Sequence, residues 1–446
     1  MKIIHCLIHY FPFHTAGTEV YTQVLATLQK KDGLEVSVVT PFIDSLSPGN
    51  IKEHYLYEGI DVYQFKEPGN PSDPDLYTGK KTPEGIGNFI TLLKKLQPDV
   101  VHFHEINISN SFCMGHVKAA KDFGAKVFYT MHLSALTCYT NVLVRNKKLC
   151  GGRLTTVTCT ACSYNTLFKI PYAAAKPLSI MANTAAVLGI SNLLKKGRLK
   201  TFLSVPLILK RKKNDIAGAV KYIDKLVCLT DWYRKMLLHN NVPAEKIAVI
   251  KQALPHSPGE ISTFRKTGTD GSGPVQLIFI GRLQPQKGVL MLINAVSTFS
   301  PDQLTLDIYG KEERNSAYFD QCIIAVNNAS HINWNGALNR EDVLNVLGRF
   351  DMLCLPSAFS EMSPLVIQEA FAAGVPVLAS RVYGNAEQVE HAVNGLLFDF
   401  NSPQSLTEQL QTIIGNRHLL YQMRQNIAAP GSFSRVHKQY LELYNS

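Results

Sequence analysis

The stretch Glu361-Met-Ser-Pro-Leu-Val-Ile-Gln-Glu369 places two carboxylates at one turn of the chain, and the residues around it decide the fold. The apolar run Met352–Leu355 predicts a short buried strand, and Pro356 begins a polar loop after it. Gly374 can end a helix, and the apolar residues after it predict the next strand. The order strand, loop, helix, strand is typical of a parallel α/β sheet.

The helix between these strands begins beside both carboxylates. Ser363 suits its N-cap, Pro364 suits its first position, and residues 365–373 continue it. Free amides at this helix start, together with the helix dipole, favour an anion such as a phosphate. A carboxylate on each side can accept hydrogen bonds from sugar hydroxyls, so the turn suits a nucleotide sugar. In isolation, such a pair of glutamates is more often a helix cap and a surface charge.

Two further stretches extend this pattern. The chain continues as Glu369-Ala-Phe-Ala-Ala-Gly-Val-Pro-Val-Leu-Ala-Ser380, and Glu387-Gln-Val and Asn394-Gly395 follow. Upstream, Gln276-Leu-Ile-Phe-Ile-Gly281-Arg282-Leu-Gln-Pro-Gln-Lys287-Gly288 predicts an apolar strand followed by two cations before a helix. Both stretches closely resemble glycosyltransferase family 4, whose members are retaining enzymes of the GT-B fold. The resemblance implies an α/β protein with two Rossmann-like, doubly wound domains that face each other across a cleft.

The resemblance also implies roles for individual residues. Arg282 and Lys287 would stabilise a diphosphate, the first through its planar fork and the second as a point charge. Glu369 would bind ribose hydroxyls, and Glu361 would bind hydroxyls of the donor sugar. The implied donor-binding residues are Gly17, Gly281, Arg282, Lys287, Glu361, Ser363, Pro364, Leu365, Val366 and Glu369. The implied catalytic residues are His132, Arg282, Lys287 and Glu361.

The N-terminal half contributes fewer recognisable residues. Residues 2–8 predict the first strand, and the loop after it contains Ala16-Gly17 where the family often has two glycines. Only Gly17 carries over, as the residue that lets backbone amides approach a phosphate. The strand that ends at His132 resembles the family's strand with an active-site histidine. His102 and His104 alternate onto one strand face, which fits either a metal pair or packing at the end of the strand.

Length and composition favour two domains. A chain of 446 residues with 46% hydrophobic residues is too long for one ordinary core. We expect an N-terminal domain over residues 1–255, with Cys-rich and basic insertions at 138–213. A linker rich in Gly, Pro, Ser and Thr follows at 256–274, and a donor domain follows at 275–425. By resemblance, the helix within 426–446 crosses back to the N-terminal domain.

Charge is distributed unevenly along the chain. Residues 123–214 contain fifteen Lys or Arg and no Asp or Glu, whereas the whole chain has a net charge of +10. Lys195 to Lys200 and Lys210 to Lys213 form two basic clusters around the apolar residues 201–209. This pattern suits an anionic membrane surface or a phosphate-bearing acceptor, or else a solvated basic face. No groove-reading motif supports nucleic-acid binding.

Four of the nine cysteines lie close together in the sequence. Cys138, Cys150, Cys159 and Cys162 could complete a structural zinc or iron site, since Cys159 and Cys162 have the spacing of a metal knuckle. The alternative is four reduced thiols. The N-terminal apolar run lacks the features of a secretion signal, so we expect a cytoplasmic protein without stable disulfides, peripheral on the cytoplasmic face of the membrane if the basic stretch binds lipid. A closed thiolate site would leave no open position for catalysis.

These features together predict a retaining glycosyltransferase of the hexosyltransferase type that needs no metal for catalysis. It would move a sugar from a UDP- or GDP-linked donor to a hydroxyl of a glycan or lipid-linked acceptor in the synthesis of a cell-surface polysaccharide. The motif Asp73-Pro-Asp75 resembles the metal-binding motif of the other glycosyltransferase fold but lacks a preceding apolar strand. Two alternatives remain: a non-catalytic scaffold that binds nucleotide sugars, and another GT-B enzyme such as an epimerase or phosphorylase.

Overall fold

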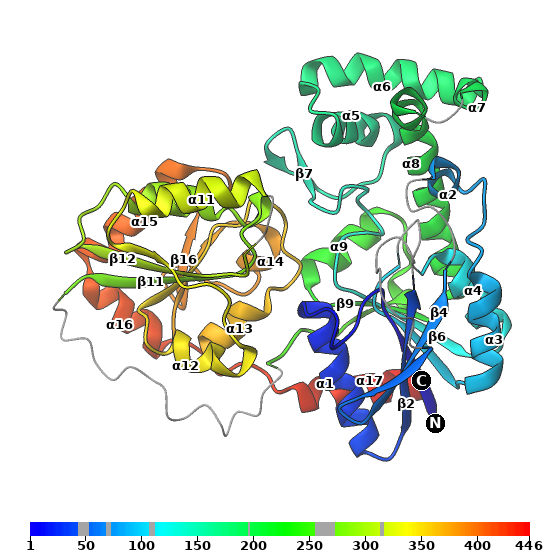
Figure 1. Cartoon of the computed structure of the whole chain (residues 1–446), viewed down its shortest axis with the longest axis horizontal. Helices are drawn as coiled ribbons and strands as arrows, with labels where there is room; N and C mark the ends of the chain where they lie inside the picture. The colour runs from blue at the N-terminus through cyan, green and yellow to red at the C-terminus, as the bar shows by residue number, and fades with distance from the viewer. Residues whose placement is uncertain (43–52, 68–72, 107–111, 195–196, 255–272, 313–315) are drawn as a thin grey trace. The chain divides into compact units, whose positions relative to one another are not determined.

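The computed structural model describes residues 1–42, 53–67, 73–106, 112–194, 197–254, 273–312 and 316–446. The chain divides into two compact α/β units (Figure 1). Unit 1 comprises Met1–Asn146, Cys150–Lys251 and Ser434–Ser446, and unit 2 comprises Lys147–Leu149 and Gln252–Phe433. Most of the expected linker, 256–274, lies outside the described residues. The C-terminal segment of unit 1 begins at Ser434, whereas the sequence placed it from 426.

Unit 1 contains an eight-stranded sheet in the order β10-β9-β6-β5-β1-β2-β4-β3. All neighbouring strands are parallel except β3 and β4, which are antiparallel. Its strands are β1 (Lys2–Cys6), β2 (Glu35–Phe42), β3 (His54–Tyr57), β4 (Ile60–Lys66), β5 (Val100–Phe103), β6 (Lys126–Met131), β9 (Lys225–Cys228) and β10 (Ile247–Val249). A separate two-stranded sheet is formed by β7 (Val144–Arg145) and β8 (Lys148–Leu149).

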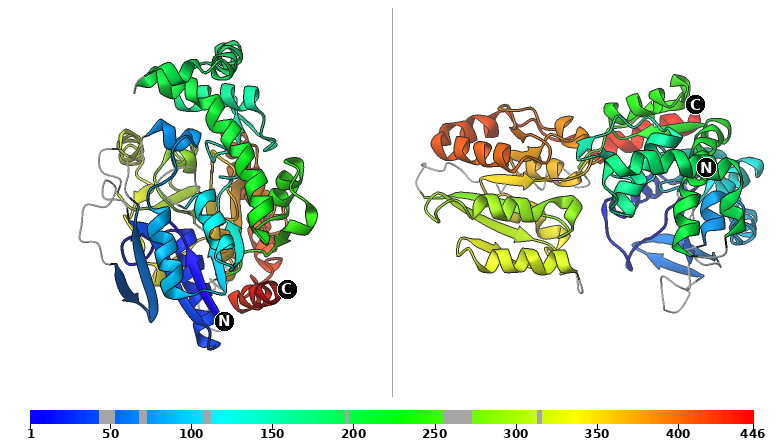
Figure 2. Two further views of the ribbon diagram at one scale, coloured as in Figure 1. Left: turned by 90° about the vertical axis from the view of Figure 1, so that its right-hand side faces the viewer. Right: turned by 90° about the horizontal axis from the view of Figure 1, so that it is seen from above.

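The helices of unit 1 cover the large sheet and build a helical projection from it. They are α1 (Gly17–Lys31), α2 (Pro74–Thr78), α3 (Ile86–Leu96), α4 (Met114–Asp122), α5 (Thr156–Leu167), α6 (Tyr172–Val187), α7 (Ile190–Leu193), α8 (Arg198–Tyr222), α9 (Asp231–His239), η1 (Ala244–Lys246) and α17 (Phe433–Asn445). Helices α5, α6 and α8 contact one another, and α7 contacts α6 and α8. Figures 1 and 2 show that α5, α6, α7 and the start of α8 lie together at one end of the unit.

Unit 2 contains a six-stranded parallel sheet in the order β13-β12-β11-β14-β15-β16. Its strands are β11 (Val275–Ile280), β12 (Leu304–Tyr309), β13 (Ile332–Trp334), β14 (Met352–Leu355), β15 (Val377–Ser380) and β16 (Gly395–Phe398). Its helices are η3 (Pro285–Lys287), α10 (Val289–Val296), α11 (Ala317–Asn327), η4 (Arg340–Asp342), α12 (Val343–Leu347), α13 (Leu365–Ala372), α14 (Tyr383–Ala386), α15 (Pro403–Gly415) and α16 (Arg417–Gln425).

The sheet of unit 2 is buried on both faces, which explains its continuous apolar strands. Leu277 and Phe279 on β11 belong to one hydrophobic cluster, whereas Ile278 between them belongs to the cluster on the other face. Strand β14 alternates in the same way, with Cys354 in the first cluster and Leu355 in the second. The period-two alternation of a strand therefore supplies two helix-covered cores from one apolar run.

Helix α13 begins one residue later than the sequence predicted. Pro364 is its N-cap, with φ −65° and ψ 123°, so Ser363 lies before the cap. The proline ring fixes φ, but the extended ψ keeps Pro364 out of the first helical turn. The helix ends at Ala372, and Gly374 has φ +70°, as expected for the residue after a helix.

The apolar stretch 201–209 is not a free surface. It lies inside α8, where Val205, Ile208 and Leu209 are all buried. Of the basic cluster that follows, Lys212 is also buried and donates to the carbonyl of Ala135. Within the described residues, no helix is long and apolar enough to cross a membrane.

Candidate functional site

In unit 2, the loop after β11 lies against the loop after β14. Gly288 follows η3 with φ +70°, and a Cβ added there would come within 1.9 Å of the carbonyl oxygen of Pro356. The backbone amide of Ala358 donates to Gln286 O at 2.7 Å. Gly288 is therefore needed both for its backbone conformation and for this close approach. The contact brings the two motifs found in the sequence to one place.

Lys287 and Glu361 meet across this contact. Lys287 Nζ lies 2.7 Å from Glu361 Oε1, and Ser357 Oγ donates to the same oxygen at 2.8 Å. The side chain of Glu361 is 8% exposed and that of Lys287 is 21% exposed. The Lys287 ammonium also lies 5.3 Å from the ring centroid of Phe359. A buried carboxylate thus holds the ammonium in place, while the partly exposed ammonium can donate to a ligand.

The sequence did not reveal the residues that fix the backbone of Glu361. Gly384 in α14 packs so closely that an added Cβ would lie 2.2 Å from the Glu361 carbonyl oxygen. Ser380 Oγ donates to Ser357 O at 2.8 Å, and Asn385 Nδ2 donates to Ser380 O at 3.1 Å. The only signal in the sequence was a glycine a few residues beyond a predicted strand.

The other expected donor residues of unit 2 lie around this pair. Arg282 directly follows Gly281 after β11 and is exposed. Ser363, Pro364, Leu365 and Val366 run from the loop into the first turn of α13, and all four are partly exposed. Glu369 lies further along α13 and is partly buried. Burial raises the pKa of Glu369 to about 7, although the positive charge of Arg340 opposes this shift.

Gly17 and His132 both belong to unit 1. Gly17 is the first residue of α1, with Ala16 as the extended N-cap, so its amide lies at a helix start. His132 directly follows β6, at the carboxyl end of a central parallel strand. Open α/β sheets bind ligands outside this end of their strands.

His132 ends a buried chain of hydrogen-bonded side chains. His132 Nε2 lies 3.2 Å from His104 Nδ1, and His104 Nε2 lies 2.9 Å from His5 Nδ1. His5 Nε2 in turn lies 2.7 Å from Gln29 Oε1. Burial lowers the pKa of His5 to about 4 and that of His132 to about 3, and it also lowers the pKa of His104. All three imidazoles are therefore neutral near pH 7.

The amide of Gln29 determines which nitrogens carry protons. Its Oε1 can only accept, so His5 carries its proton on Nε2 and accepts through Nδ1. His104 must then donate from Nε2 and accept through Nδ1. His132 consequently donates from Nε2, which leaves Nδ1 with a lone pair that can accept from a ligand hydroxyl.

The ligand atoms of His5, His102 and His104 lie within 4.8 Å of one another, the one such group of three that the described residues contain. These nitrogens already hydrogen-bond to one another, to His132, to the Gln29 amide or to hydroxyls. His102 Nδ1 lies 2.6 Å from the Tyr444 hydroxyl, and His102 Nε2 lies 2.8 Å from Thr130 Oγ1. The group is therefore a hydrogen-bonded cluster, which α17 reaches through Tyr444.

The four clustered cysteines line one cavity of about 30 Å³ in unit 1. Burial raises the pKa of Cys162 to about 12, and the three neighbouring thiols, Cys138, Cys150 and Cys159, add to the shift. A zinc ion bonded to thiolates at about 2.3 Å requires sulfur atoms about 4 Å apart. Among the described residues, only His5, His102 and His104 bring three potential metal-ligand atoms within 4.8 Å of one another. No three of the four sulfurs therefore lie that close together. An ion would require the thiols to turn inward.

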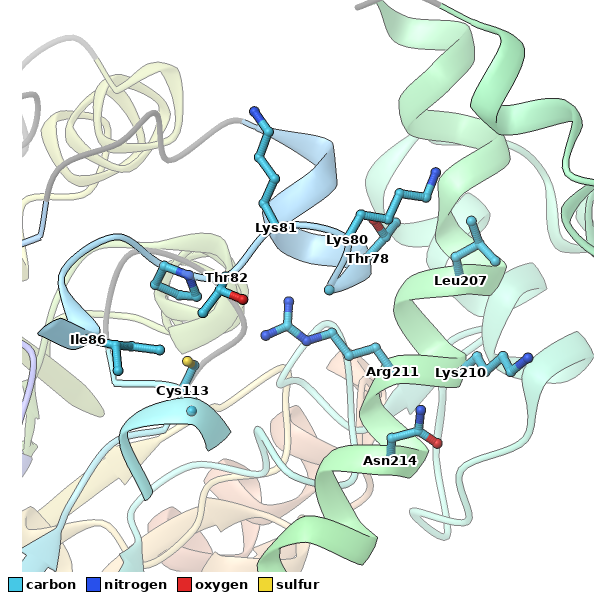
Figure 3. A pocket seen from close by; sticks show the side chains of 13 residues that line it. Thr78, Lys80, Lys81, Thr82, Ile86, Cys113, Leu207, Lys210, Arg211 and Asn214 are labelled. Carbon is cyan, nitrogen blue, oxygen red and sulfur yellow. The ribbon is translucent and has the colours of Figure 1, made fainter. Parts of the chain in front are cut away.

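A larger cavity of about 420 Å³ lies between α2, α4 and α8 of unit 1 (Figure 3). Its lining contains no Asp or Glu, and its charged residues are Lys80, Lys81, Lys210 and Arg211. Figure 3 shows the guanidinium of Arg211 directed toward Thr82 and Cys113, whereas Lys210 is directed away. Arg211 also donates to the carbonyl of Leu76.

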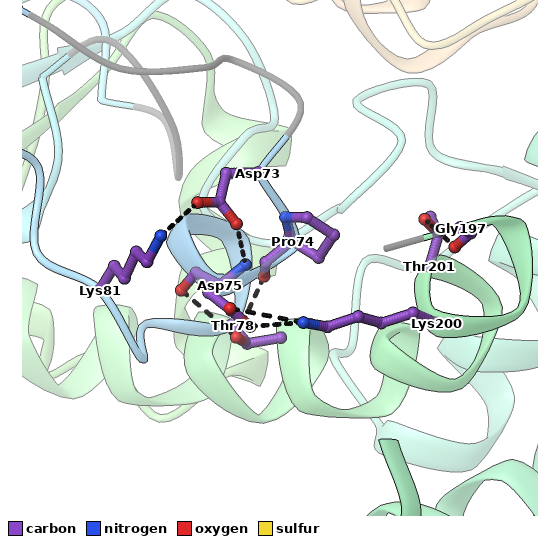
Figure 4. Close-up of polar contacts among 8 residues, drawn as sticks. All are labelled: Asp73, Pro74, Asp75, Thr78, Lys81, Gly197, Lys200 and Thr201. Carbon is purple, nitrogen blue, oxygen red and sulfur yellow. Dashed lines mark hydrogen bonds and ion pairs between the residues drawn. The ribbon is translucent and has the colours of Figure 1, made fainter. Parts of the chain in front are cut away.

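Asp73 and Asp75 are used within unit 1 (Figure 4). Asp73 Oδ1 accepts from the amide of Asp75 at 3.0 Å and so caps α2, while Asp73 Oδ2 lies 2.8 Å from Lys81 Nζ. Asp75 Oδ1 lies 3.2 Å from Lys200 Nζ. Their spacing thus reflects a helix cap and two ion pairs.

Comparison with known families agrees with both units. A family described as "Glycosyl transferases group 1" matches residues 261–429, and a "Glycosyl transferase 4-like domain" matches residues 16–159. Both models describe glycosyltransferases, and together they identify the chain as a glycosyltransferase of the family-4 type. An uncharacterized glycosyltransferase of Methanocaldococcus jannaschii is 29% identical over 51% of this chain and 64% of its own length. The D-inositol 3-phosphate glycosyltransferase of Corynebacterium glutamicum is 27% identical over 47% of this chain. The matched region spans about half of that relative, or 54%.

Solved structures show the same fold at low sequence identity. HepE of Anabaena, in complex with UDP and glucose, matches with a TM-score of 0.63 and 16% identity over 100% of both chains. Sucrose-phosphate synthase of Thermosynechococcus elongatus matches with a TM-score of 0.66 and 15% identity over 100% of this chain and 98% of its own. The fold is therefore GT-B, built from two Rossmann-like units, as the sequence predicted.

Proposed function

We propose that this protein is a retaining glycosyltransferase that uses a nucleoside-diphosphate sugar. The observation that carries the proposal is the Lys287–Glu361 pair at 2.7 Å, held where the loops after β11 and β14 meet. It supports the proposal because an ammonium fixed by a buried carboxylate is a preorganised donor for a leaving diphosphate. The UDP bound to the similar structure of HepE agrees with a nucleotide donor.

The reaction would need little covalent chemistry from the protein. The bond from the sugar anomeric carbon to the diphosphate oxygen breaks as the acceptor hydroxyl attacks from the same face. The proton of that hydroxyl passes to the departing phosphate oxygen. Arg282 and Lys287 would stabilise the growing negative charge, so the proposal uses protein cations in place of a catalytic metal. Glu361 and His132 would orient the sugar hydroxyls, and Glu369 the ribose.

We propose a phosphate-bearing acceptor, such as a lipid-linked glycan in polysaccharide synthesis, for the cavity between α2, α4 and α8. No Asp or Glu lines this cavity, and the Arg211 guanidinium is directed into it. A guanidinium beside a hydroxyl such as that of Thr82 suits a phosphate.

The four clustered cysteines, also in unit 1, are proposed as a structural zinc or iron site that closes when their side chains turn into their cavity.

The experiment that tests the proposal has two stages. Thermal shifts with UDP, GDP, ADP and their sugars should identify the nucleotide that stabilises the protein. Release of the free nucleoside diphosphate should then depend on added acceptor, and NMR of the product should show the anomeric configuration of the donor. Nucleotide binding without acceptor-dependent release would indicate a scaffold, whereas inversion of the anomeric centre would exclude the retaining mechanism. Interconversion of the donor sugar without acceptor would indicate an epimerase.

A further inference from the structure

Helix α6 of unit 1 carries its bulky apolar side chains on the outside. The positions that it buries are small: Ala175, Ser179 and Ala182. By contrast, Met181 is 67% exposed and Val187 is 87% exposed. A surface helix of a globular protein ordinarily shows the reverse pattern. Packing within unit 1 therefore does not account for the outer face of α6.

The apolar face continues past the end of the helix. We define the α6–α7 surface by six apolar residues that are 39% to 87% exposed: Ile180, Met181, Val187, Leu188, Ile190 and Leu199. Helix α7 contacts both α6 and α8, so these residues come from neighbouring elements at one end of the helical projection (Figures 1 and 2). Apolar residues gathered in this way on a surface mark a site of interaction.

The charges around this surface identify its partner. Lys176 on α6 and Arg198 at the start of α8 are exposed. No Asp or Glu occurs anywhere in residues 123–214. A bulky apolar face that is bordered by cations, in a segment that contributes no carboxylate of its own, is complementary to an anionic lipid surface, whose acyl chains and headgroups it can contact together.

We propose that the α6–α7 surface docks this protein on an anionic membrane. The sequence suggested residues 201–209 as the membrane-contacting segment, but these residues lie in α8 and several of their side chains are buried. The α6–α7 surface is proposed instead. No helix among the described residues can cross a membrane, so α6 would lie along the lipid headgroups. This docking does not depend on the proposed transfer reaction and can be measured without a donor.

Vesicle sedimentation tests the proposal with the full chain. Vesicles that contain phosphatidylglycerol should bind the protein at low salt, and binding should fall steeply as salt is raised. Vesicles of phosphatidylcholine alone should bind it weakly. The triple variant Met181→Gln, Val187→Gln and Leu188→Gln should lower partitioning roughly tenfold or more. The matched control is Ile324→Gln in unit 2, where Ile324 is 62% exposed and outside the surface.

Charge and fold are controlled separately. Lys176→Gln with Arg198→Gln should reduce binding to anionic vesicles, whereas Lys438→Gln, at an exposed position on α17, should not. If the triple variant does not fold, Val187→Gln alone serves, because an 87% exposed side chain contributes little to packing. Wild-type binding by the apolar variants would overturn the proposal. So would a dimer in vesicle-free solution that the same variants abolish, because the surface would then join two copies of the chain.

Discussion

His104 Nδ1 lies 3.2 Å from His132 Nε2, so the histidine expected at the active site is oriented by a second, fully buried imidazole. The chain of contacts continues through His5 to Gln29. Because every ring in it is neutral, the chain can fix one tautomer and leave His132 Nδ1 as an acceptor. Gln29, which is linked to His132 through two imidazoles, thereby sets the hydrogen-bonding character of His132.

Gln29 should control the tautomer of His132. Gln29→Leu removes the acceptor for His5, so the directions of the hydrogen bonds are no longer fixed, and transfer should slow by roughly tenfold. Side-chain ¹⁵N NMR of histidine-labelled protein should show a mixture of His132 tautomers in this variant. Gln29→Glu keeps an acceptor in place and should restore the Nε2–H form. An unchanged His132 tautomer in Gln29→Leu would contradict this relationship.

Arg282 and Lys287 of unit 2 should be required for rapid sugar transfer. Lys287→Ala or Arg282→Ala should lower the transfer rate by roughly 10²-fold or more, on the scale of losing one charge-stabilising donor. Lys311→Ala, at an exposed cation in the same unit, is the matched control. Wild-type rates in the first two variants would remove both residues from the site.

The Lys287–Glu361 pair should also affect stability. Lys287→Ala leaves the buried Glu361 carboxylate without its cation, which should cost about 1–3 kcal/mol of unfolding free energy. Adding Glu361→Gln removes the uncompensated charge and should recover part of the loss in thermal denaturation. Activity should not recover, because the ammonium is still missing. Equal stability of the single and double variants would show that the uncompensated charge of Glu361 is not the cause of the loss.

Gly288 should be far less replaceable than Gly336. Both have positive φ, +70° and +73°, so alanine at either position carries a backbone penalty of about 1–2 kcal/mol. Only at Gly288 would the added Cβ also meet a backbone oxygen, at 1.9 Å, whereas Gly336 has nothing within 4 Å. Gly288→Ala should therefore lose more stability in urea denaturation than Gly336→Ala, and it should impair donor binding. Similar losses in the two variants would argue against the close approach.

Glu369 should make nucleotide binding and stability depend on pH. Its raised pKa, about 7, means that the carboxylate is protonated in the folded state between about pH 4.5 and 7 but ionised in the unfolded chain. Its contribution to stability therefore falls as pH rises through this window. Glu369→Gln should raise the melting temperature at pH 8 more than at pH 5. Nucleotide affinity should weaken below pH 7 in the wild type, and this dependence should be absent in the variant, as isothermal titration can measure.

The four clustered cysteines should bind about one zinc or iron per chain. Cys159→Ser should lower the metal content and destabilise unit 1 without abolishing nucleotide binding, because Lys287, Glu361 and Glu369 lie in unit 2. Cys322→Ser, at a buried cysteine of unit 2, should leave the metal content unchanged. Elemental analysis that finds no metal, with Cys138, Cys150, Cys159 and Cys162 all reactive in the folded protein, would exclude the site.

The sequence by itself determined the architecture of unit 2. The predicted strand Met352–Leu355 has the observed bounds, because a short apolar run between turn residues has few other stable arrangements. It also placed Lys287 and Glu361 in loops that follow parallel strands, and such loops lie at one edge of the sheet. Helix α13 differs from the prediction by one residue at each end. Pro364 is its N-cap and not its first helical residue, and the helix ends at Ala372.

The tertiary structure alone decided which side chains meet and which face solvent. Nothing local in the sequence could show that Gly384 packs on Glu361, or that Gln29 and Tyr444 reach the histidines, since these contacts join segments far apart in the chain. Tertiary packing also decided which apolar residues are exposed in the predicted insertion of unit 1, residues 138–213. Residues 201–209 and the face of α6 are both apolar, and only packing determined that the first is buried while the second is exposed.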